Sequence, residues 1–159
     1  MEITTASPQD KEQIMALYEE QKGREYCFWD EDYPSEEFID FDIERQALFV
    51  MKRPDRIIAA ISIDEDENVE NLECWNKDLL PGAELSRLAV SIDMQNAGIA
   101  KKMLKYGMDA LKEKGYKSVH FLVNRDNIKA TACYAHFDFN IVGECSLYDQ
   151  DFLCYEKEL

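Results

Sequence analysis

Residues 95–100 constrain the fold of this chain most, because they join an expected strand to an expected helix. An apolar run over residues 85–90 precedes them, and a run with helical spacing over residues 99–114 follows. A small-residue turn at such a junction leaves backbone N–H groups free at the positive end of the helix. Gly98 adds backbone freedom and lets a ligand approach closely. The segment therefore predicts either ordinary turn chemistry or a binding site for a phosphate or pyrophosphate.

Length and composition fit one globular domain with a buried core. The chain has 159 residues, of which 46% are apolar and 32% are charged. No apolar run is long enough to cross a bilayer, and the first residues lack a basic stretch followed by an apolar one. The sequence therefore predicts a cytoplasmic protein that does not bind membranes.

The charge of the chain is strongly negative and unevenly distributed. The net charge is −15, and residues 1–83 hold 22 acidic and 8 basic side chains. Nucleic-acid binding is disfavoured, because phosphate contact needs a basic surface. The acidic half could attract a cationic substrate, or it could simply keep the protein in solution. An acidic protein that mimics DNA would explain the charge but not the turn at residues 95–100.

The cysteines and histidines do not predict a metal site. The five cysteines are scattered without a C-x-x-C pair, and the only histidines are His120 and His136. Reduced thiols that act as small hydrophobic side chains are expected. His120 is expected to be a hydrogen-bonded histidine within a strand, with a proton-relay role as the alternative.

Apolar periodicity predicts strands and helices in a mixed α/β sheet with helices on both faces and a single core. Helices are expected at residues 8–20, from residue 35 onward, at 99–114 and at 127–137. The helix from residue 35 has Phe38 and Phe41 at the spacing of one face, with Asp42 as an optional third position. Strands are expected at residues 3–5, 47–52, 56–63, 71–75, 84–90, 118–123, 140–145 and 151–156.

Two motifs in the second half of the chain match one family. The first follows a strand that ends Leu88-Ala89-Val90 and consists of Gln95, Gly98 and Ala100. The second consists of Asn127, Ala130 and Tyr134, followed by Phe139. Over residues 84–145 the chain resembles the GNAT superfamily of acyl-CoA-dependent N-acetyltransferases, and the order of elements extends the resemblance to the whole chain.

The resemblance implies a single domain over residues 1–159 with the GNAT fold. That fold is a mainly antiparallel twisted sheet of about six to seven strands, flanked by helices, with two splayed central strands. Residues 1–83 would form the acceptor side, and residues 84–159 would bind acetyl-CoA. A β-bulge is the usual device for the splay. Dimers are frequent among relatives, so a homodimer is an expected assembly.

The resemblance also implies how acetyl-CoA is held. Backbone N–H groups near Gly98 would bind the pyrophosphate, and Leu88 and Val90 would pair with the pantetheine arm. The N–H near Leu88 would polarise the thioester carbonyl. The expected cofactor-binding residues are Leu88, Ala89, Val90, Gln95, Asn96, Ala97, Gly98, Ile99, Ala100, Lys101, Asn127, Ala130 and Tyr134.

Glu84 and Tyr134 are the catalytic residues that the resemblance implies. Glu84 would take the proton of the incoming ammonium, often through water. The alternative is a solvated carboxylate at a strand end. Tyr134 would give a proton to the departing CoA thiolate, and the alternative is an aromatic side chain buried in the core. Asn127 could equally well only cap its helix.

The acceptor site is expected among aromatic and acidic side chains. Trp29, Tyr33 and Trp75 could contact an ammonium group by cation–π interaction, although ordinary packing also explains them. Ser86 shares a face with Glu84 and could touch substrate or a relay water, whereas Arg87 should face the other side of the sheet.

Two positions depart from the family pattern. Asp138 replaces a glycine that would end a helix in the left-handed conformation, which Asp tolerates better than most residues. Asn96 and Ala97 replace a basic residue and glycine, a loss for which Lys101 and Lys102 could compensate.

The functional prediction is acetyl transfer from acetyl-CoA to a primary amine of a small molecule or peptide. The alternative is a non-catalytic module that binds acyl-CoA or a basic protein partner through its acidic half. The identity of the amine cannot be read from the sequence.

Overall fold

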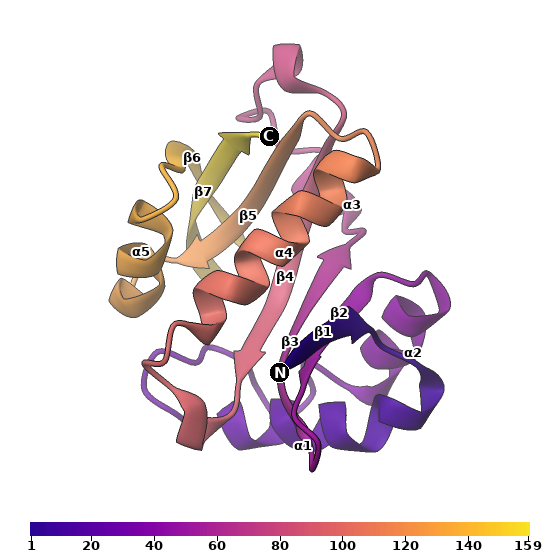
Figure 1. The fold of residues 1–159 in the computed structure, drawn as a ribbon. Coiled ribbons are helices and arrows are strands. Elements are labelled where there is room, and N and C mark those ends of the chain that lie inside the picture. The colour runs from indigo at the N-terminus through magenta and orange to yellow at the C-terminus, as the bar shows by residue number, and fades with distance from the viewer. The chain divides into compact units, whose positions relative to one another are not determined.

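A computed structural model describes all 159 residues and contains seven strands and five α-helices (Figure 1). The strands are β1 (Glu2–Thr5), β2 (Leu48–Lys52), β3 (Ile57–Asp64), β4 (Gly82–Val90), β5 (Ser118–Asn124), β6 (Asn140–Leu147) and β7 (Gln150–Glu158). The helices are α1 (Lys11–Gln21), α2 (Glu36–Glu44), α3 (Glu67–Glu70), α4 (Ile99–Glu113) and α5 (Ile128–Ala135). No helix is both long and apolar enough to cross a membrane.

The strands form one sheet in the order β1-β2-β3-β4-β5-β7-β6. The pairs β1–β2, β2–β3, β5–β7 and β6–β7 are antiparallel, and β4 runs parallel to β5. The expected mixed, mainly antiparallel sheet is therefore confirmed, with β1 at an edge and β5 in the interior.

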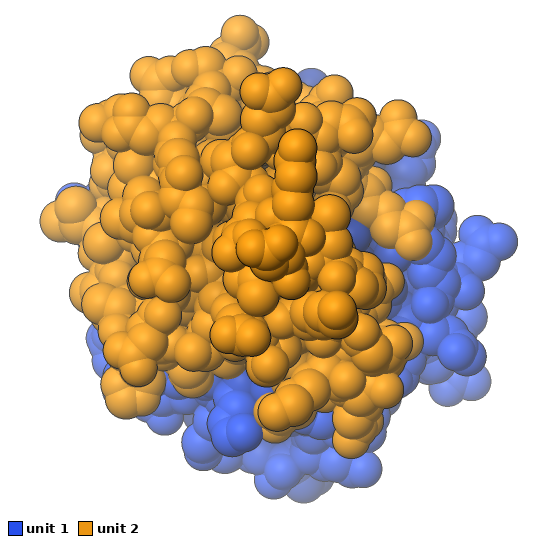
Figure 2. Space-filling view, turned by 90° about the horizontal axis from the view of Figure 1, so that it is seen from above, with its two compact units in different colours: residues 1–64, 85–107 blue, residues 65–84, 108–159 orange.

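The chain divides into two compact units, which Figure 2 colours separately. Unit 1 comprises residues 1–64 and 85–107, and unit 2 comprises residues 65–84 and 108–159. The chain passes from one unit to the other at the end of β3, inside β4 and inside α4. These units do not follow the two sequence halves that the family resemblance implies.

Unit 1 buries apolar side chains on both faces of its strands. On one face, Leu48 and Val50 of β2 join a core with Ile14 and Leu17 of α1. On the other face, the ring of Phe49 lies 5.3 Å from that of Tyr106 in α4. Strand residues alternate between faces, so this pattern confirms helices on both sides of the sheet.

Helix α2 forms as expected but buries a different face. Ile39 and Asp42 are fully buried, whereas Phe38 and Phe41 are 36% and 44% exposed. Burial of the Asp42 carboxylate is tolerated because Arg45 donates to it at 2.6 Å and other groups bind its second oxygen. The face that Phe38 and Phe41 share is therefore not the buried one.

Unit 2 contains no strand at residues 71–75, which corrects a second expectation. Residues 67–70 form the short helix α3, and Asp66 caps it by accepting from the N–H of Asn68 at 3.0 Å. The Trp75 indole then folds back and donates to the Val69 carbonyl at 2.8 Å. The Asn71 and Leu72 N–H groups donate to the carbonyls of Glu67 and Val69, so a turn stands where the strand was expected.

Asp138 adopts the left-handed conformation that the sequence predicts, with φ of +59°. Because glycine has no steric penalty there, Asp138→Gly should raise the free energy of unfolding by about 1 kcal/mol or less. Urea denaturation would measure the change. Asp126→Gly is the matched control, since Asp126 has negative φ and glycine there should destabilise. An equal decrease in the free energy of unfolding in both variants would contradict the prediction.

Candidate active site

The segment between β4 and α4 has the geometry of an anion-binding turn. Asn96 and Gly98 have φ of +62° and +77°, and α4 begins at Ile99. At the start of α4, the first backbone N–H group with a helical hydrogen bond is that of Lys102. It donates to the Gly98 carbonyl at 3.2 Å. The N–H groups just before it have no intrahelical acceptor. Alternation of left-handed and helical residues creates a concave row of such groups, which suits a phosphate.

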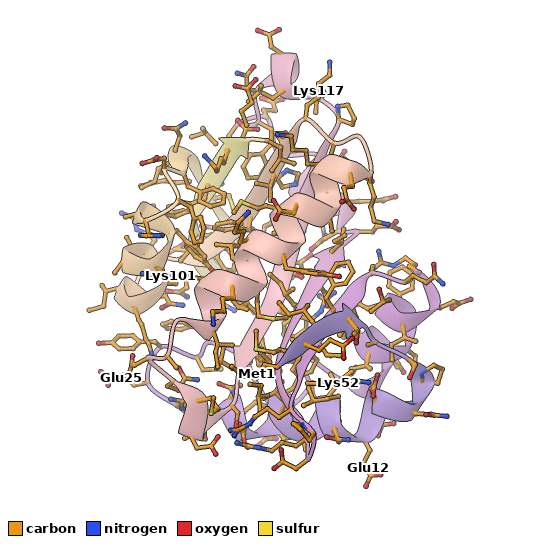
Figure 3. The ribbon with its side chains drawn as sticks, in the orientation of Figure 1. Met1, Glu12, Glu25, Lys52, Lys101 and Lys117 are labelled. Atoms are coloured by element: carbon orange, nitrogen blue, oxygen red, sulfur yellow. The ribbon has the colours of Figure 1, made fainter.

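The exposure of this loop is compatible with binding a ligand. Asn96, Ala97 and Gly98 are exposed, Ala100 is half-buried, and Ile99 is buried as an anchor of α4. Lys101 is exposed in the first turn of α4, where Figure 3 labels it. A cation at that place could contribute to phosphate binding.

The Gln95 side chain stabilises the turn. Its Nε2 group donates to the Val90 carbonyl at 2.7 Å, and Nε2 of Gln21 donates to the same oxygen at 2.8 Å. A carbonyl oxygen has two lone pairs, so both are used here. Any pairing of a pantetheine arm with this part of β4 must therefore use Leu88 or the Val90 N–H rather than the Val90 carbonyl.

Gly98→Ala tests the loop. A Cβ at Gly98 would meet nothing within 4 Å, so the cost is the left-handed φ, roughly 1–2 kcal/mol. When the backbone relaxes to relieve that strain, the N–H groups of the loop change direction. We therefore expect the dissociation constant for CoA, measured by calorimetry, to rise about tenfold.

Gly23→Ala is the matched control for the loop variant. Gly23 has φ of +83° and equally open surroundings, but it ends α1. It should lose similar stability and keep its affinity for CoA. Equal affinity losses in both variants would contradict a role for the loop amides.

Glu84 is buried in β4, with 6% of its surface exposed. It lies in parallel register with His120 of β5, so both side chains project from the same face of the sheet. The alternative of a solvated carboxylate at a strand end therefore does not describe it. The stretches of β4 and β5 beyond this pairing belong to different units, so the expected splay between them stays a prediction.

Ser86 and Arg87 do not face opposite sides of the sheet, contrary to expectation. The Ser86 hydroxyl donates to Oδ2 of Asp64 at 3.0 Å, and Nη1 of Arg87 donates to the same atom at 2.9 Å. Arg87 has φ of +50°, which breaks the alternation of the strand. Two consecutive side chains on one face are the pattern of a β-bulge, the device expected for the splay of β4.

Tyr134 lies in α5 within an aromatic cluster of unit 2. Its ring centroid is 4.4 Å from that of Phe121 and 5.8 Å from that of Tyr155. Burial raises the pKa of the Tyr134 hydroxyl above its ordinary value, and the neighbouring Cys133 and Tyr155 add to the rise. The hydroxyl therefore keeps its proton at neutral pH, as a general acid must.

Asn127 caps α5, which was one of the two roles expected for this residue. Its Oδ1 atom accepts from the Ala130 N–H at 3.1 Å. Capping therefore accounts for Asn127, and contact of Asn127 or Ala130 with acetyl-CoA stays a prediction.

Trp29 and Tyr33 pack against each other and against their neighbours in unit 1. Their rings meet edge to face at 6.4 Å, and Tyr33 meets Phe38 at 4.9 Å. The Tyr33 hydroxyl accepts from Nη1 of Arg87 at 3.1 Å. Packing thus explains part of this cluster, while both side chains remain half-buried.

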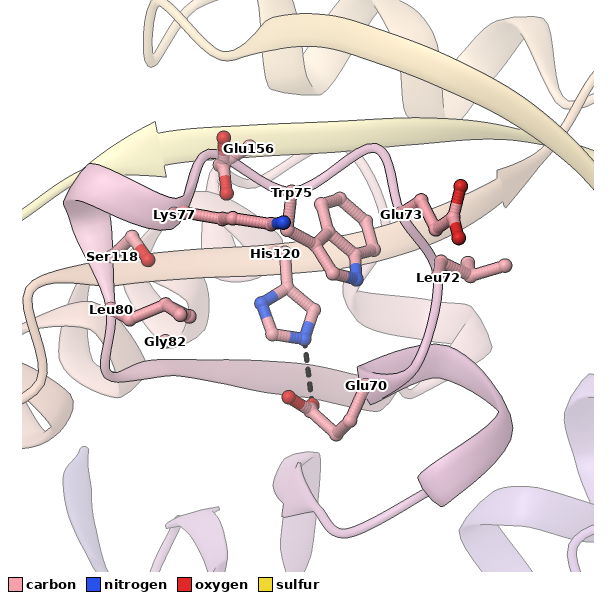
Figure 4. A pocket seen from close by; sticks show the side chains of 10 residues that line it. All are labelled: Glu70, Leu72, Glu73, Trp75, Lys77, Leu80, Gly82, Ser118, His120 and Glu156. Atoms are coloured by element: carbon pink, nitrogen blue, oxygen red, sulfur yellow. Dashed lines mark hydrogen bonds and ion pairs between the residues drawn. The ribbon is translucent and has the colours of Figure 1, made fainter.

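Trp75 lines a cavity of about 150 Å³ in unit 2, shown in Figure 4. Its ring stacks on His120 at 4.4 Å, and Nε2 of His120 hydrogen-bonds to Oε1 of Glu70 at 2.7 Å. His120 thus has the hydrogen-bonded strand position expected for it. The lining is Glu70, Leu72, Glu73, Trp75, Lys77, Leu80, Gly82, Ser118, His120 and Glu156. Trp75 belongs to a different unit from Trp29 and Tyr33, so a shared acceptor pocket stays a prediction.

All five cysteines are free thiols, and only Cys154 is fully buried. No group of three or more His, Cys, Asp or Glu side chains is arranged to hold a metal ion.

The buried ion pair of unit 1 was not foreseen from the sequence. Asp42 and Arg87 are 0% and 4% exposed, and they form an ion pair at 2.9 Å. Burial alone would lower the pKa of Arg87, but the hydroxyl and the two carboxylates around it raise that pKa well above its ordinary value. The available signal was an aspartate on the apolar stripe of an expected helix.

Several solved structures share the fold of this chain. An acetyltransferase of the GNAT family from Streptococcus agalactiae superposes with a TM-score of 0.81 at 20% identity, covering 99% of this chain and 95% of that one. A ribosomal-protein-alanine N-acetyltransferase from Brucella melitensis gives 0.78 at 16% identity, with both chains fully covered. YncA from Salmonella typhimurium, solved with its cofactor acetyl-CoA, gives 0.77 at 14% identity, covering 100% and 94%.

Sequence comparison gives the family directly. No curated protein matches the chain. The model of the acetyltransferase (GNAT) family matches residues 12–139, which is most of the chain. The chain therefore belongs to the GNAT family of acetyltransferases, enzymes that use acetyl-CoA as co-substrate.

Proposed function

We propose that this enzyme transfers the acetyl group of acetyl-CoA to a primary amine of a small molecule or peptide by direct attack. The observation that carries the proposal is the burial of Glu84 in β4, four residues before Leu88. A carboxylate in that place, out of bulk water, is suited to accept the proton of an incoming ammonium. An amine with a pKa near ~10 is mostly charged at neutral pH, so the reaction needs such an acceptor.

The turn before α4 provides the binding part of the mechanism. Its N–H groups and the positive end of α4 would hold the pyrophosphate of acetyl-CoA, with Lys101 adding a positive charge. The Leu88 N–H would then donate to the thioester oxygen and stabilise the charge that develops there.

The chemical step assigns one proton transfer to each catalytic residue. Glu84 takes a proton from the ammonium, directly or through water, and the neutral amine attacks the carbonyl carbon. The new C–N bond forms as the C–S bond breaks, and the electron pair leaves with sulfur. The Tyr134 hydroxyl gives its proton to the thiolate, and the second proton of the attacking nitrogen passes through solvent to the tyrosinate and restores its hydroxyl. Its raised pKa supports this role, because the hydroxyl stays protonated until it is used.

The acceptor that we propose is cationic. Residues 1–83 hold 22 acidic and 8 basic side chains, which would raise the local concentration of an ammonium compound. Structural neighbours from Brucella melitensis and Escherichia coli are named as ribosomal-protein-alanine N-acetyltransferases. Peptides with an amino-terminal alanine therefore belong in any substrate panel. A cytoplasmic location and a homodimer stay predictions of the sequence.

Calorimetry followed by thiol detection tests the proposal. The protein is titrated with acetyl-CoA and then incubated with a panel of polyamines, amino acids, aminoglycosides and amino-terminal peptides. We expect binding, and release of CoA thiol with at least one cationic amine above the rate of hydrolysis. Binding without release across the panel would favour a non-catalytic acyl-CoA-binding module instead.

A further inference from the structure

Arg87 has an unusual backbone conformation for its place in the fold. It is the one residue of β4 with positive φ, at +50°, and it is neither glycine nor a residue that favours the left-handed region. Such a residue is strained and persists only where its surroundings hold it.

The conformation of Arg87 shifts the alternation of β4 by one residue. Leu85 contacts Gly107 of α4, where an added Cβ would come within 3.0 Å of it. Ser86 and Arg87 both reach Asp64, on the side of the sheet opposite α4. Ala89 belongs to the core formed with α1 and α2 on that same side. Two consecutive side chains on one face define the bulge, which resets the direction of the backbone groups that follow.

All three nitrogen atoms of the Arg87 guanidinium donate hydrogen bonds to neighbouring side chains. Nε and Nη2 bind both oxygens of Asp42 at 2.9–3.3 Å, and Nη1 binds Asp64 at 2.9 Å and Tyr33 at 3.1 Å. The side chain is 1% exposed, so these contacts lie away from solvent screening. Arg87 is therefore fully occupied within the protein and has no donor left for a substrate.

The two carboxylates are themselves anchored to different elements. Asp42 of α2 also accepts from Ser62 at 2.8 Å and from Arg45 at 2.6 Å. Asp64 is the last residue of β3, the strand next to β4. The bulge is thus fixed from a helix and from a neighbouring strand at once.

We propose that Arg87 is a positioning residue, and that its ion pairs with Asp42 and Asp64 fix the bulge so that the Leu88 N–H points to the thioester oxygen. This inference rests on the proposed function, since it assigns Arg87 an effect on the same reaction. Loss of the ion pair should misalign a donor that matters most in the transition state and should leave the pyrophosphate contacts intact.

Asp64→Asn is the variant that tests the inference. Removal of Arg87 or Asp42 would leave a buried charge without its partner and unfold the protein, whereas the Asp64 side chain is 13% exposed. Asparagine keeps the shape but loses the charge. We expect kcat to fall about tenfold and the dissociation constant for CoA to stay within about threefold of the wild-type value. Hydrogen–deuterium exchange should increase over residues 85–90.

Asp40→Asn is the matched control. Asp40 also accepts from a cation at 2.9 Å in unit 1, but the pair with Lys11 is exposed. This variant should keep wild-type kcat and exchange. An unchanged kcat in Asp64→Asn, or exchange over residues 85–90 no faster than in the control, would overturn the inference. A wild-type protein that binds acetyl-CoA but acetylates no amine would overturn the proposed function instead, and the exchange result would still decide whether the ion pair holds the bulge.

Discussion

Glu84→Gln is expected to lower kcat/KM for the amine by roughly 10²-fold near neutral pH and to recover much of that loss at high pH. The reason is the charge of the substrate. Below the pKa of the amine, Glu84 must remove a proton before attack, and a glutamine cannot. Above that pKa the amine arrives neutral and needs no base, so the ratio of wild-type to variant activity should fall as pH rises.

The measurement is a pH profile of kcat/KM for both enzymes with one amine of known pKa. Glu144→Gln is the matched control, because Glu144 lies in an exposed ion pair with Arg125 at 2.9 Å in the same unit. It should follow the wild-type profile throughout. A constant ratio between Glu84→Gln and wild type at all pH values would remove Glu84 from the role of base.

Tyr134→Phe is expected to lower kcat by roughly 10²-fold or less, because the CoA thiolate then leaves without a proton donor. The ring and its packing against Phe121 are retained, so the fold should be unaffected. Because the pKa of Tyr134 is raised, the wild-type enzyme should not lose activity through ionisation of this hydroxyl until the pH exceeds the ordinary tyrosine value.

Tyr155→Phe provides the control within the same aromatic cluster. Tyr155 is 3% exposed, and its buried hydroxyl has no hydrogen-bond partner. Loss of that hydroxyl should leave kcat unchanged and cost no stability. Steady-state turnover with saturating acetyl-CoA compares the two variants. Similar kcat values for them would show that the Tyr134 hydroxyl donates no proton in the rate-limiting step.

Long periodic segments of this chain were predictable from the sequence. Helix α4 was expected at residues 99–114 and spans Ile99–Glu113, because its apolar spacing extends over four turns. The left-handed conformation of Asp138 was also predictable, because the family resemblance implies a helix-ending glycine at this position. In both cases local chemistry decides the structure.

The prediction failed where distant residues decide the structure. Residues 71–75 were expected to form a strand, but Trp75 instead packs on His120, 45 positions along the chain. Ser86 and Arg87 should alternate, yet a carboxylate at Asp64 draws both to one side. Asp42 is buried because Arg87 neutralises it. No local pattern contains these long-range pairings.

The candidate site was predictable only as far as the family motifs reach. In the turn at residues 95–100, Gly98 has the positive φ that its backbone freedom allows, whereas the positive φ of Asn96 was not foreseen. The use of the Val90 carbonyl by Gln21 and Gln95 was not foreseen, because Gln21 lies in another helix. Hydrogen bonds from side chains to backbone groups distant in sequence produce no periodic pattern in the sequence.

The most direct test of this account is a crystal structure of the protein grown with millimolar CoA. We expect CoA with its diphosphate within hydrogen-bond distance of the amides at the start of α4, beside Gly98. An empty turn at that concentration, or a diphosphate bound elsewhere on the protein, would contradict it.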